Sequence, residues 1–300
     1  MPRLGPISCV TIASHDLDVS LLLYRDFLGY QCIAEGAVQA DLAKLWARPQ
    51  LAGRRYALTL PEGQGSTYLR FVHSPRDASY RPFRHLGWNA AELMVQDTDA
   101  VARRLVGSPF KVIGPPADLS FSDKIRAMQV LGPSGEALYL TSFKEKLSAF
   151  DTPDAHCFID RTFIVIVGGP SVAAVSRFYS THLGVAEAPV IPSVISALSR
   201  AHGLPADTRH DIAALALVGQ SFIEADTMPK GTLPRSAPDG ELPPAISMVS
   251  FGVDSLSATK LSFVSPPLAL TSAPYQGHRA ALATGVGGEL IELIEGLSPS

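Results

Sequence analysis

The sequence has little that would mark an exported or membrane-spanning protein. Of its 300 residues only three are cysteines. Because Cys9, Cys32 and Cys157 are odd in number and lack a metal-binding spacing, we expect reduced thiols in a cytoplasmic protein. The longest apolar stretches, such as Ile212 to Val218, are too short to cross a bilayer. The first residues also lack the apolar stretch of a signal peptide.

An excess of positive charge is also missing. Lys and Arg number 25 against 28 Asp and Glu, so the formal net charge is −3. Such a chain has no general electrostatic reason to bind a nucleic acid or an anionic membrane. We therefore expect neither as a partner, and we expect a small-molecule ligand and a monomer or homodimer.

What the sequence does contain is enough apolar material for a large core. Hydrophobic residues make up 46% of the chain and charged residues 18%. This composition is typical of a folded globular protein, and 300 residues fit one large domain or two ordinary ones.

Internal similarity favours two domains. Three short patterns of the first half return in the same order about 154 residues later, which indicates two homologous halves of about 150 residues. The matched segments are Tyr24 to Gly29 with Tyr179 to Gly184, Gln64 to Arg70 with Val218 to Glu224, and Gly135 to Leu140 with Gly288 to Leu293.

A finer repeat lies within each half. Ile7 to Ala13 alternates like a strand, Asp16 is a candidate N-cap, and Leu17 to Leu28 has helical spacing that ends at Gly29. Further strands follow, and the pattern of strand, helix and several strands then recurs four times in all. The expected later first strands are Asn89 to Val95, Thr162 to Val167 and Ile246 to Val253.

Loops separate these units. The polar segment Lys144 to His156 is the expected boundary between the halves, and the proline-rich segment Thr227 to Pro244 is an expected exposed excursion. An additional helix is predicted around Val194 to His202.

Four βαβββ units with a Tyr-x-x-x-Leu-Gly helix end and a Gly-x-x-(Ile/Leu)-x-Leu last strand resemble the vicinal oxygen chelate superfamily. That superfamily includes glyoxalase I, bleomycin-resistance proteins and extradiol dioxygenases. The resemblance implies an α+β fold in which four modules pair into two pseudo-symmetric cup-shaped domains. We expect an N-terminal domain over residues 1–148, with modules at about 5–75 and 85–145, and a C-terminal domain over residues 156–297, with modules at about 158–228 and 245–296.

The resemblance also implies a divalent metal held by inward-facing residues on the first and last strands of each module. In the first half these positions carry Cys9, Arg70, Ala90 and Tyr139. Arginine stays protonated and cannot ligate a cation, and alanine has no donor atom. A metal in the first half is therefore not expected, and Cys9 is interpreted as a small core residue.

The second half carries Glu224 and Glu292 at the last-strand positions, each in an apolar strand. Alternation places both carboxylates on the face that the resemblance turns into the cup. There they would act as acid and base or ligate one ion of Fe, Mn, Zn or Ni, although two carboxylates without histidine make a weak site. Asp160 or Asp226 would complete an oxygen-rich site. The alternative is that each glutamate lies near a sheet edge in water, without a role.

Two further groups are candidates. His278, next to Arg279 and before the strand of Glu292, is a candidate acid/base residue, with a solvent-exposed histidine as the alternative. In the first half, five residues have the predicted inward parity and suit a planar anionic or oxygenated ligand, unless that half is a filled structural domain. They are Tyr68, Arg70, Trp88, Glu92 and Tyr139.

The leading hypothesis is an enzyme with its site in the C-terminal cup. Glu224, Glu292 and His278 would be catalytic, and Arg70, Trp88, Tyr139, Tyr68 and Arg279 would contact the substrate. The substrate would be a small oxygenated metabolite, such as an aromatic or dicarbonyl compound, and the reaction that of a lyase, an isomerase or a ring-cleavage dioxygenase. No nucleotide cofactor is expected. The alternative is a metal-free protein that sequesters a small molecule, as bleomycin-resistance proteins do.

Overall fold

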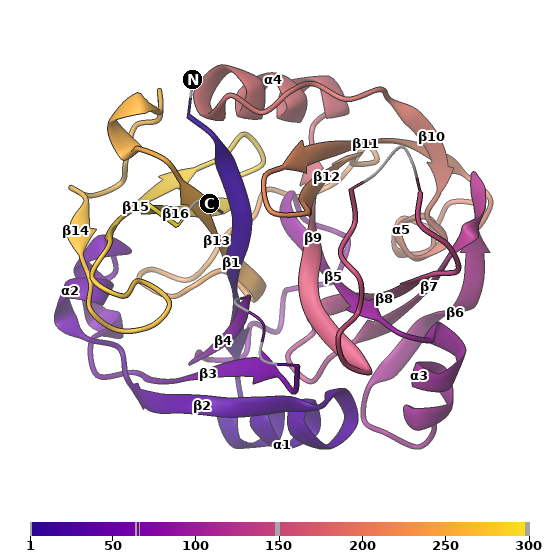
Figure 1. The fold of residues 1–300 in the computed structure, drawn as a ribbon, viewed down its shortest axis with the longest axis horizontal. Coiled ribbons are helices and arrows are strands. Elements are labelled where there is room, and N and C mark those ends of the chain that lie inside the picture. The colour runs from indigo at the N-terminus through magenta and orange to yellow at the C-terminus, as the bar shows by residue number, and fades with distance from the viewer. Residues whose placement is uncertain (1, 64, 66, 148–150, 298–300) are drawn as a thin grey trace.

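The chain folds into two mixed β-sheets of eight strands each, which lie side by side and curl into half-barrels (Figure 1). This computed structural model describes residues 2–63, 65, 67–147 and 151–297. Within those residues, no helix has both the length and the hydropathy of a membrane span. The expected α+β class, built from four modules in two cup-shaped sheets, is confirmed.

The first and fourth modules form one sheet, which we call the 1–4 cup. Its central strands β1 and β13 pair antiparallel, and the sheet order is β14-β15-β16-β13-β1-β4-β3-β2. The elements are β1 (Leu4–Ser14), α1 (Leu17–Leu28), β2 (Tyr30–Ala37), α2 (Ala40–Leu45), η1 (Pro49–Leu51), β3 (Arg55–Pro61), β4 (Tyr68–His73), β13 (Ala245–Val253), η2 (Leu256–Ala258), β14 (Leu268–Ala269), β15 (Arg279–Thr284) and β16 (Leu290–Glu295).

The second and third modules form the other sheet, which we call the 2–3 cup. Here β5 and β9 are the central antiparallel pair, and the order is β10-β11-β12-β9-β5-β8-β7-β6. The elements are β5 (Gly87–Val95), α3 (Thr98–Arg104), β6 (Lys111–Leu119), β7 (Ser122–Leu131), β8 (Ala137–Phe143), β9 (Ile159–Gly169), α4 (Val172–Leu183), β10 (Ile191–Val194), α5 (Ser196–Ala201), β11 (Arg209–Leu217) and β12 (Ser221–Thr227).

The sequence left open whether each cup forms within one half or across the two halves, and this pairing corrects the expectation of a site shared by Glu224 and Glu292. The two halves of the sequence do not form separate sheets, so Glu224 on β12 and Glu292 on β16 lie in different cups and cannot share a ligand. The physical reason is that all four first strands are long and buried, so the repeat does not specify which two pair at their edges. The domain bounds given above stay a prediction, and their limits 1 and 148 lie outside the described residues.

The helix signals act as expected. The Asp16 side chain accepts a hydrogen bond from the Val19 N–H at the start of α1, and Gly29 ends the helix in the left-handed conformation with φ 73°. Ser171 and Gly184 do the same for α4. In each module the apolar side of the helix packs on one face of the sheet, which leaves the other face for the interior of the cup.

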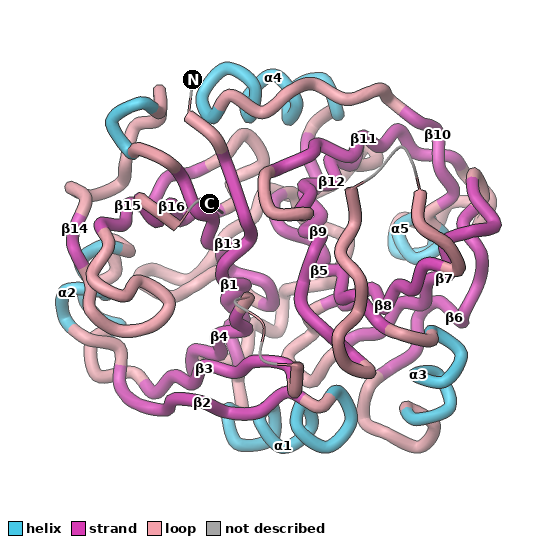
Figure 2. The backbone as a smooth tube through the Cα atoms, in the orientation of Figure 1, coloured by secondary structure: helices cyan, strands magenta, loops and turns pink. Residues whose placement is uncertain are grey.

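Two short helices pack against the sheets, α2 against β15 and α5 against β6, and both can be followed in the backbone trace (Figure 2). The predicted helix near Val194 to His202 is confirmed as α5, which packs Ala197 and Leu198 into the interior of the 2–3 cup. Its counterpart α2 in the first module was not predicted, and it brings Leu42 and Trp46 into the 1–4 cup.

The two sheets are joined by a continuous apolar core and by buried polar contacts. Trp88 belongs to this junction, because its indole N–H donates to the Leu290 carbonyl across the sheets and its ring packs near Phe251. The predicted inward orientation of Trp88 is therefore wrong. A register shift between Trp88 and Ala90 changes the alternation at this end of β5.

Candidate functional site

The interior of the 1–4 cup is occupied by the protein's own side chains. Strand register places Arg70 of β4 beside Thr11 of β1, and Glu292 of β16 beside Ser250 of β13. The Arg70 Nη2 donates to Glu292 Oε2 at 3.2 Å, and the two side chains are only 1% and 0% exposed. These are the positions at which the sequence predicted a ligand-binding face, and they hold an internal ion pair.

Further contacts complete this pair. Arg70 Nε donates to Thr11 Oγ1 at 2.9 Å, and Arg70 Nη1 donates to the Tyr275 hydroxyl at 2.7 Å. Glu292 Oε1 accepts from the Tyr275 hydroxyl and from Trp46 Nε1, each at 2.8 Å. Each nitrogen of the Arg70 guanidinium therefore has a hydrogen-bond partner inside the fold.

Trp46 and Tyr275 also cover the guanidinium, whose carbon lies 4.7 Å from the Trp46 ring centroid and 5.8 Å from that of Tyr275. Cys9 lies buried nearby as the predicted small core residue, and burial raises the pKa of its thiol to about 11. In the 1–4 cup the positions expected to face a ligand are therefore occupied by contacts among the protein's own side chains.

The 2–3 cup contains a pocket of about 110 Å³. Its floor carries Glu92 of β5, Tyr139 of β8 and Glu224 of β12, all on the inward faces of their strands. The remaining wall is largely apolar and aromatic. It comprises Leu119, Phe121, Ile125, Ala127, Gln129, Phe143, Thr152, Ile164, Ser193, Val194, Ile195, Ile212, Ala214 and Phe222.

The carboxyl groups of this cup are the chemically unusual feature of the molecule. Asp226 lies two residues after Glu224 on the same face of β12, and the two side chains are close enough to hydrogen-bond when one is protonated. Burial is the main reason that the pKa of Glu92 is raised to about 7 and that of Asp226 to about 8. Burial, together with the charge of Asp226, raises the pKa of Glu224 well above its ordinary value.

These shifts matter because carboxyl groups with pKa values near neutrality can hold or release a proton at physiological pH. Tyr139 behaves differently, since burial raises its pKa far above the ordinary range and keeps its hydroxyl neutral. The pocket thus combines carboxyl groups that can exchange protons with a hydroxyl that stays a hydrogen-bond donor.

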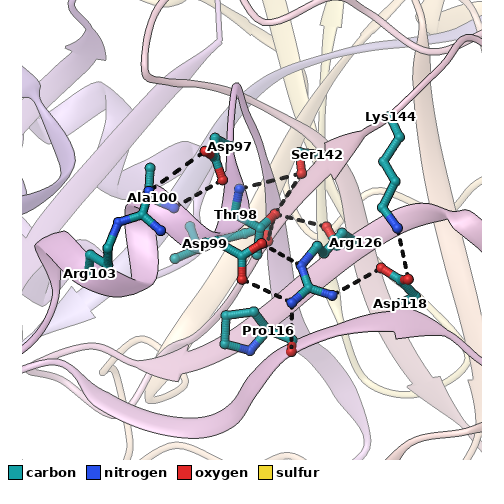
Figure 3. A network of polar contacts seen from close by, with 11 residues as sticks. Asp97, Thr98, Asp99, Ala100, Arg103, Pro116, Asp118, Arg126, Ser142 and Lys144 are labelled. Atoms are coloured by element: carbon teal, nitrogen blue, oxygen red, sulfur yellow. Dashed lines mark hydrogen bonds and ion pairs between the residues drawn. The ribbon is translucent and has the colours of Figure 1, made fainter.

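The wall formed by the β6–β7 hairpin is fixed from the outside by ion pairs (Figure 3). Arg126 makes two hydrogen bonds to the Asp99 carboxylate, at 2.7 and 2.9 Å, and a third to Asp118 at 3.1 Å. Lys144 holds Asp118 from the other side at 2.8 Å. Because Arg126 faces away from the cup, its neighbours Ile125 and Ala127 face into the pocket.

The other predicted site residues lie elsewhere. Tyr68 is half-buried at the start of β4, and Arg279 is exposed and 3.6 Å from Glu295. His278 is half-buried before β15, with its ring next to Gly296 in the sheet that does not contain Glu224. Of the predicted residues, the structure brings together Glu224, Tyr139 and Glu92.

Sequence reasoning placed Glu92 and Glu224 in different cups and offered Asp226 only as a supplementary metal ligand. Their inward parity was readable from the strands, but their meeting depends on the pairing of the second and third modules. Gln129 and the phenylalanines of the wall were not predicted, because no sequence signal distinguishes a pocket wall from a filled core.

The metal implied by the resemblance does not fit either cup. In the 1–4 cup the Arg70 guanidinium occupies the interior, and a guanidinium cannot ligate a cation. In the 2–3 cup the neighbour of Glu224 on β9 is Ile166, the Tyr139 hydroxyl is neutral, and no imidazole faces the floor. No group of three or more His, Cys, Asp or Glu side chains in the described part of the chain is arranged to hold a metal ion.

Comparison with known proteins places the fold. The sequence matches no family model and no curated protein. Glyoxalase I from Zea mays superposes with a TM-score of 0.64 at 14% identity, over 98% of this chain and 92% of that one. A putative dioxygenase from Bacillus subtilis superposes with a TM-score of 0.63 at 11% identity, over 99% and 86% of the two chains. The chain therefore has the vicinal oxygen chelate fold, in its form with four modules and two cups.

Proposed function

We propose that this protein acts on a small molecule by proton transfer in the pocket of the 2–3 cup. The observation that carries the proposal is the presence of Glu92 and Glu224 on the floor of an apolar pocket, with the buried Asp226 beside Glu224. In many enzymes two nearby acidic groups have different pKa values because their surroundings differ, and one then serves as the acid and the other as the base. The fold alone supports no particular reaction.

The roles follow from the environments. Glu92, with a pKa of about 7, is partly ionised at neutral pH and serves as the base that removes a proton next to a carbonyl group. The neutral Tyr139 hydroxyl donates a hydrogen bond to the carbonyl oxygen as it gains negative charge. The Glu224–Asp226 pair shares a proton and holds the polar end of the molecule.

The apolar wall supports this chemistry in two ways. Phe121, Phe143 and Tyr139 offer flat faces to an aromatic or unsaturated body, and they keep bulk water away from the carboxyl groups. A low-dielectric surrounding raises the pKa of a carboxyl group, so the wall and the floor act together. The pocket is small, which favours a compact substrate.

Deuterium exchange tests the proposal without knowledge of the product. Small ketones, dicarbonyl compounds and phenolic carbonyl compounds are incubated with the protein in D2O, and the loss of the proton next to the carbonyl is followed by NMR. We expect exchange for at least one compound and a fall of about 100-fold in Glu92→Gln, with a smaller fall in Tyr139→Phe. Glu187→Gln, which removes an exposed carboxylate, is the matched control.

Equal exchange rates in Glu92→Gln and the parent would refute the role of Glu92.

A second function is favoured by the apolar wall and by the absence of imidazole from the pocket lining: sequestration of a small molecule without turnover. Binding that is lost in Glu224→Gln, with no exchange for any compound, would identify that function.

A further inference from the structure

The interior of the 1–4 cup holds a planar cation, the guanidinium group of Arg70. The Arg70 guanidinium there is bound by one carboxylate and two hydroxyl groups, and the Trp46 ring covers its face. This is a complete site for a planar organic cation, built and filled by the same chain.

The 2–3 cup repeats the arrangement with one change. In the 1–4 cup Glu292 lies beside Ser250 of the neighbouring strand, and in the 2–3 cup Glu224 lies beside Ile166 in the same way. Glu224 is therefore the equivalent of Glu292, and both cups have a carboxyl group at this place. Register also matches Arg70 with Tyr139 of the facing module. The carboxyl group is therefore kept, while the internal cation that balances it is missing and a pocket lies beside it.

The balance of charge in the 2–3 cup points the same way. Glu92 takes the place that Thr11 has in the other cup, and Asp226 adds a third carboxyl group. The pocket lining contains no Lys, Arg or His side chain. Unpaired carboxylates in an apolar pocket are costly, so they need a bound cation or a proton.

An independent observation marks the place for a donor. Asp226 is 4% exposed, and its Oδ1 atom has no hydrogen-bond partner among the described residues. Buried polar atoms are rarely left unpaired, and here the unpaired atom is an acceptor next to Glu224 on the face that turns into the cup. A ligand with several N–H donors would satisfy both groups.

We propose that the pocket of the 2–3 cup binds a compact organic cation of the amidinium or guanidinium class. One N–H group would lie on Glu224 in the pocket lining, a second would point towards the buried Asp226 beside it, and the apolar body would lie against the phenylalanines of the wall. This inference rests on the proposed function and adds to it a cationic amidinium or guanidinium group as the polar end of the substrate. Planar N–H donors match carboxylates in two-point hydrogen bonds, as Arg side chains do.

Binding of a cation should change the number of protons on the Glu224–Asp226 pair. In the free protein the Glu224–Asp226 pair retains a proton because no cation neutralises it. When the cation binds, its positive charge favours the ionised pair, and the proton passes to the solvent. Binding of a cation at neutral pH must therefore release protons, whereas binding of a neutral molecule of the same shape must not.

Calorimetry with three probes of similar shape tests this on the full chain. Benzamidine is the cation, benzamide the neutral analogue and benzoate the anion. Each is titrated at pH 7 in phosphate and in Tris, whose different ionisation enthalpies report the protons released. We expect benzamidine to bind at least about tenfold more tightly than benzamide, with proton release, and benzoate to bind weakest.

The variants separate the possible outcomes. Glu224→Gln and Asp226→Asn should each weaken benzamidine at least about tenfold and reduce the proton release, while leaving benzamide within about threefold. Glu187→Gln, which removes the same charge outside the pocket, should change neither probe. Two variants are used so that a folding defect in one does not decide the result.

If benzamide or benzoate binds as tightly as benzamidine and Ala214→Leu abolishes that binding, the cation is wrong while the small-molecule pocket stands. If no probe binds, the cation proposal fails, and the exchange experiment with carbonyl compounds then decides separately on the proposed function. Benzamidine binding that is unaffected by Glu224→Gln and Asp226→Asn also overturns the inference.

Discussion

Arg70 and Glu292 meet across the interior of the 1–4 cup, 3.2 Å apart and almost fully buried. They come from the first and fourth modules, so their contact joins the two ends of the chain. In the 2–3 cup the equivalent places carry Tyr139 and Glu224, and a pocket replaces the ion pair. One cup is thus stabilised by its own charges, and the other retains carboxyl groups without an internal cation.

The contributions of Arg70 and Glu292 to the free energy of unfolding should depend strongly on each other. Arg70→Met leaves the Glu292 carboxylate buried without its cation, and we expect the free energy of unfolding to fall by about 3 to 5 kcal/mol. Arg70→Met combined with Glu292→Met should be closer to the parent than the sum of the two single changes. Urea unfolding of the four proteins measures both effects, and strictly additive losses would contradict the coupling.

Arg55→Met serves as the control for this series. Arg55 pairs with Asp18 at 2.8 Å, but both side chains are more than half exposed. Solvent screens such a pair, so its removal should leave the urea midpoint nearly unchanged.

Stability should fall as the pH rises from about 5 to 8. The folded pKa of Glu92 is about 7 against an ordinary 4.5, so the native state binds this proton more tightly than the unfolded state. The stabilisation is fully present below the unfolded pKa and is lost as the pH passes through 7. Glu136 and Glu289, each with a pKa of about 7 because of burial, add to the same trend.

Glu92→Gln tests the contribution of the pocket. At pH 8 we expect this variant to be more stable than the parent by on the order of 2 kcal/mol, and at pH 4.5 the difference should nearly vanish. Denaturant unfolding at the two pH values gives the comparison. A variant less stable than the parent at pH 8 would mean that the Glu92 carboxylate has a stabilising partner.

Two equivalent tyrosine–glutamate contacts should stabilise the fold. The Tyr24 hydroxyl donates to Glu136 at 2.9 Å, and the Tyr179 hydroxyl donates to Glu289 at 3.3 Å. Each bond joins the helix of one module to the residue just before the last strand of the next module. Tyr24→Phe and Tyr179→Phe should each lower the free energy of unfolding by about 1 to 2 kcal/mol, because a buried carboxyl group loses a donor.

The double variant should show nearly additive losses, since the two contacts share no residue. Tyr56→Phe is the control, because the half-buried Tyr56 hydroxyl has no hydrogen bond among the described residues. Thermal unfolding of the parent, the two single variants, the double variant and the control is sufficient, and losses equal to that of Tyr56→Phe would remove any role of the two contacts.

The sequence predicted the modules well because their signals are local. Caps such as Asp16 and Gly29, and alternation in strands such as β12, depend on neighbouring residues only. The edge strands β2, β6 and β10 were missed for physical reasons as well. β2 is mostly exposed and lacks an apolar alternation, and β6 contains Pro115 and Pro116, which an edge strand tolerates.

The site could be predicted only in part. The inward faces of Glu92, Tyr139 and Glu224 follow from alternation, but their meeting requires the pairing of the second module with the third. That choice depends on contacts between distant strands, which no local pattern encodes. The same holds for Trp46 and Tyr275, whose closing of the 1–4 cup depends on loops that reach across the sheet.

The ion pairs of Arg126 should control the pocket from a distance. Arg126→Gln removes the bonds that tie β7 to Asp99 and Asp118, so the β6–β7 hairpin should move more freely. Because Leu119 and Phe121 on this hairpin line the pocket, we expect weaker binding of benzamidine and faster amide hydrogen exchange over residues 111–131. Arg103→Gln is the control, since exposed Arg103 pairs with Asp97 at 3.9 Å and, among the described residues, makes no hydrogen bond or ion pair to the β6–β7 hairpin. If Arg126→Gln changes hydrogen exchange but leaves binding intact, the hairpin is not a working wall of the pocket.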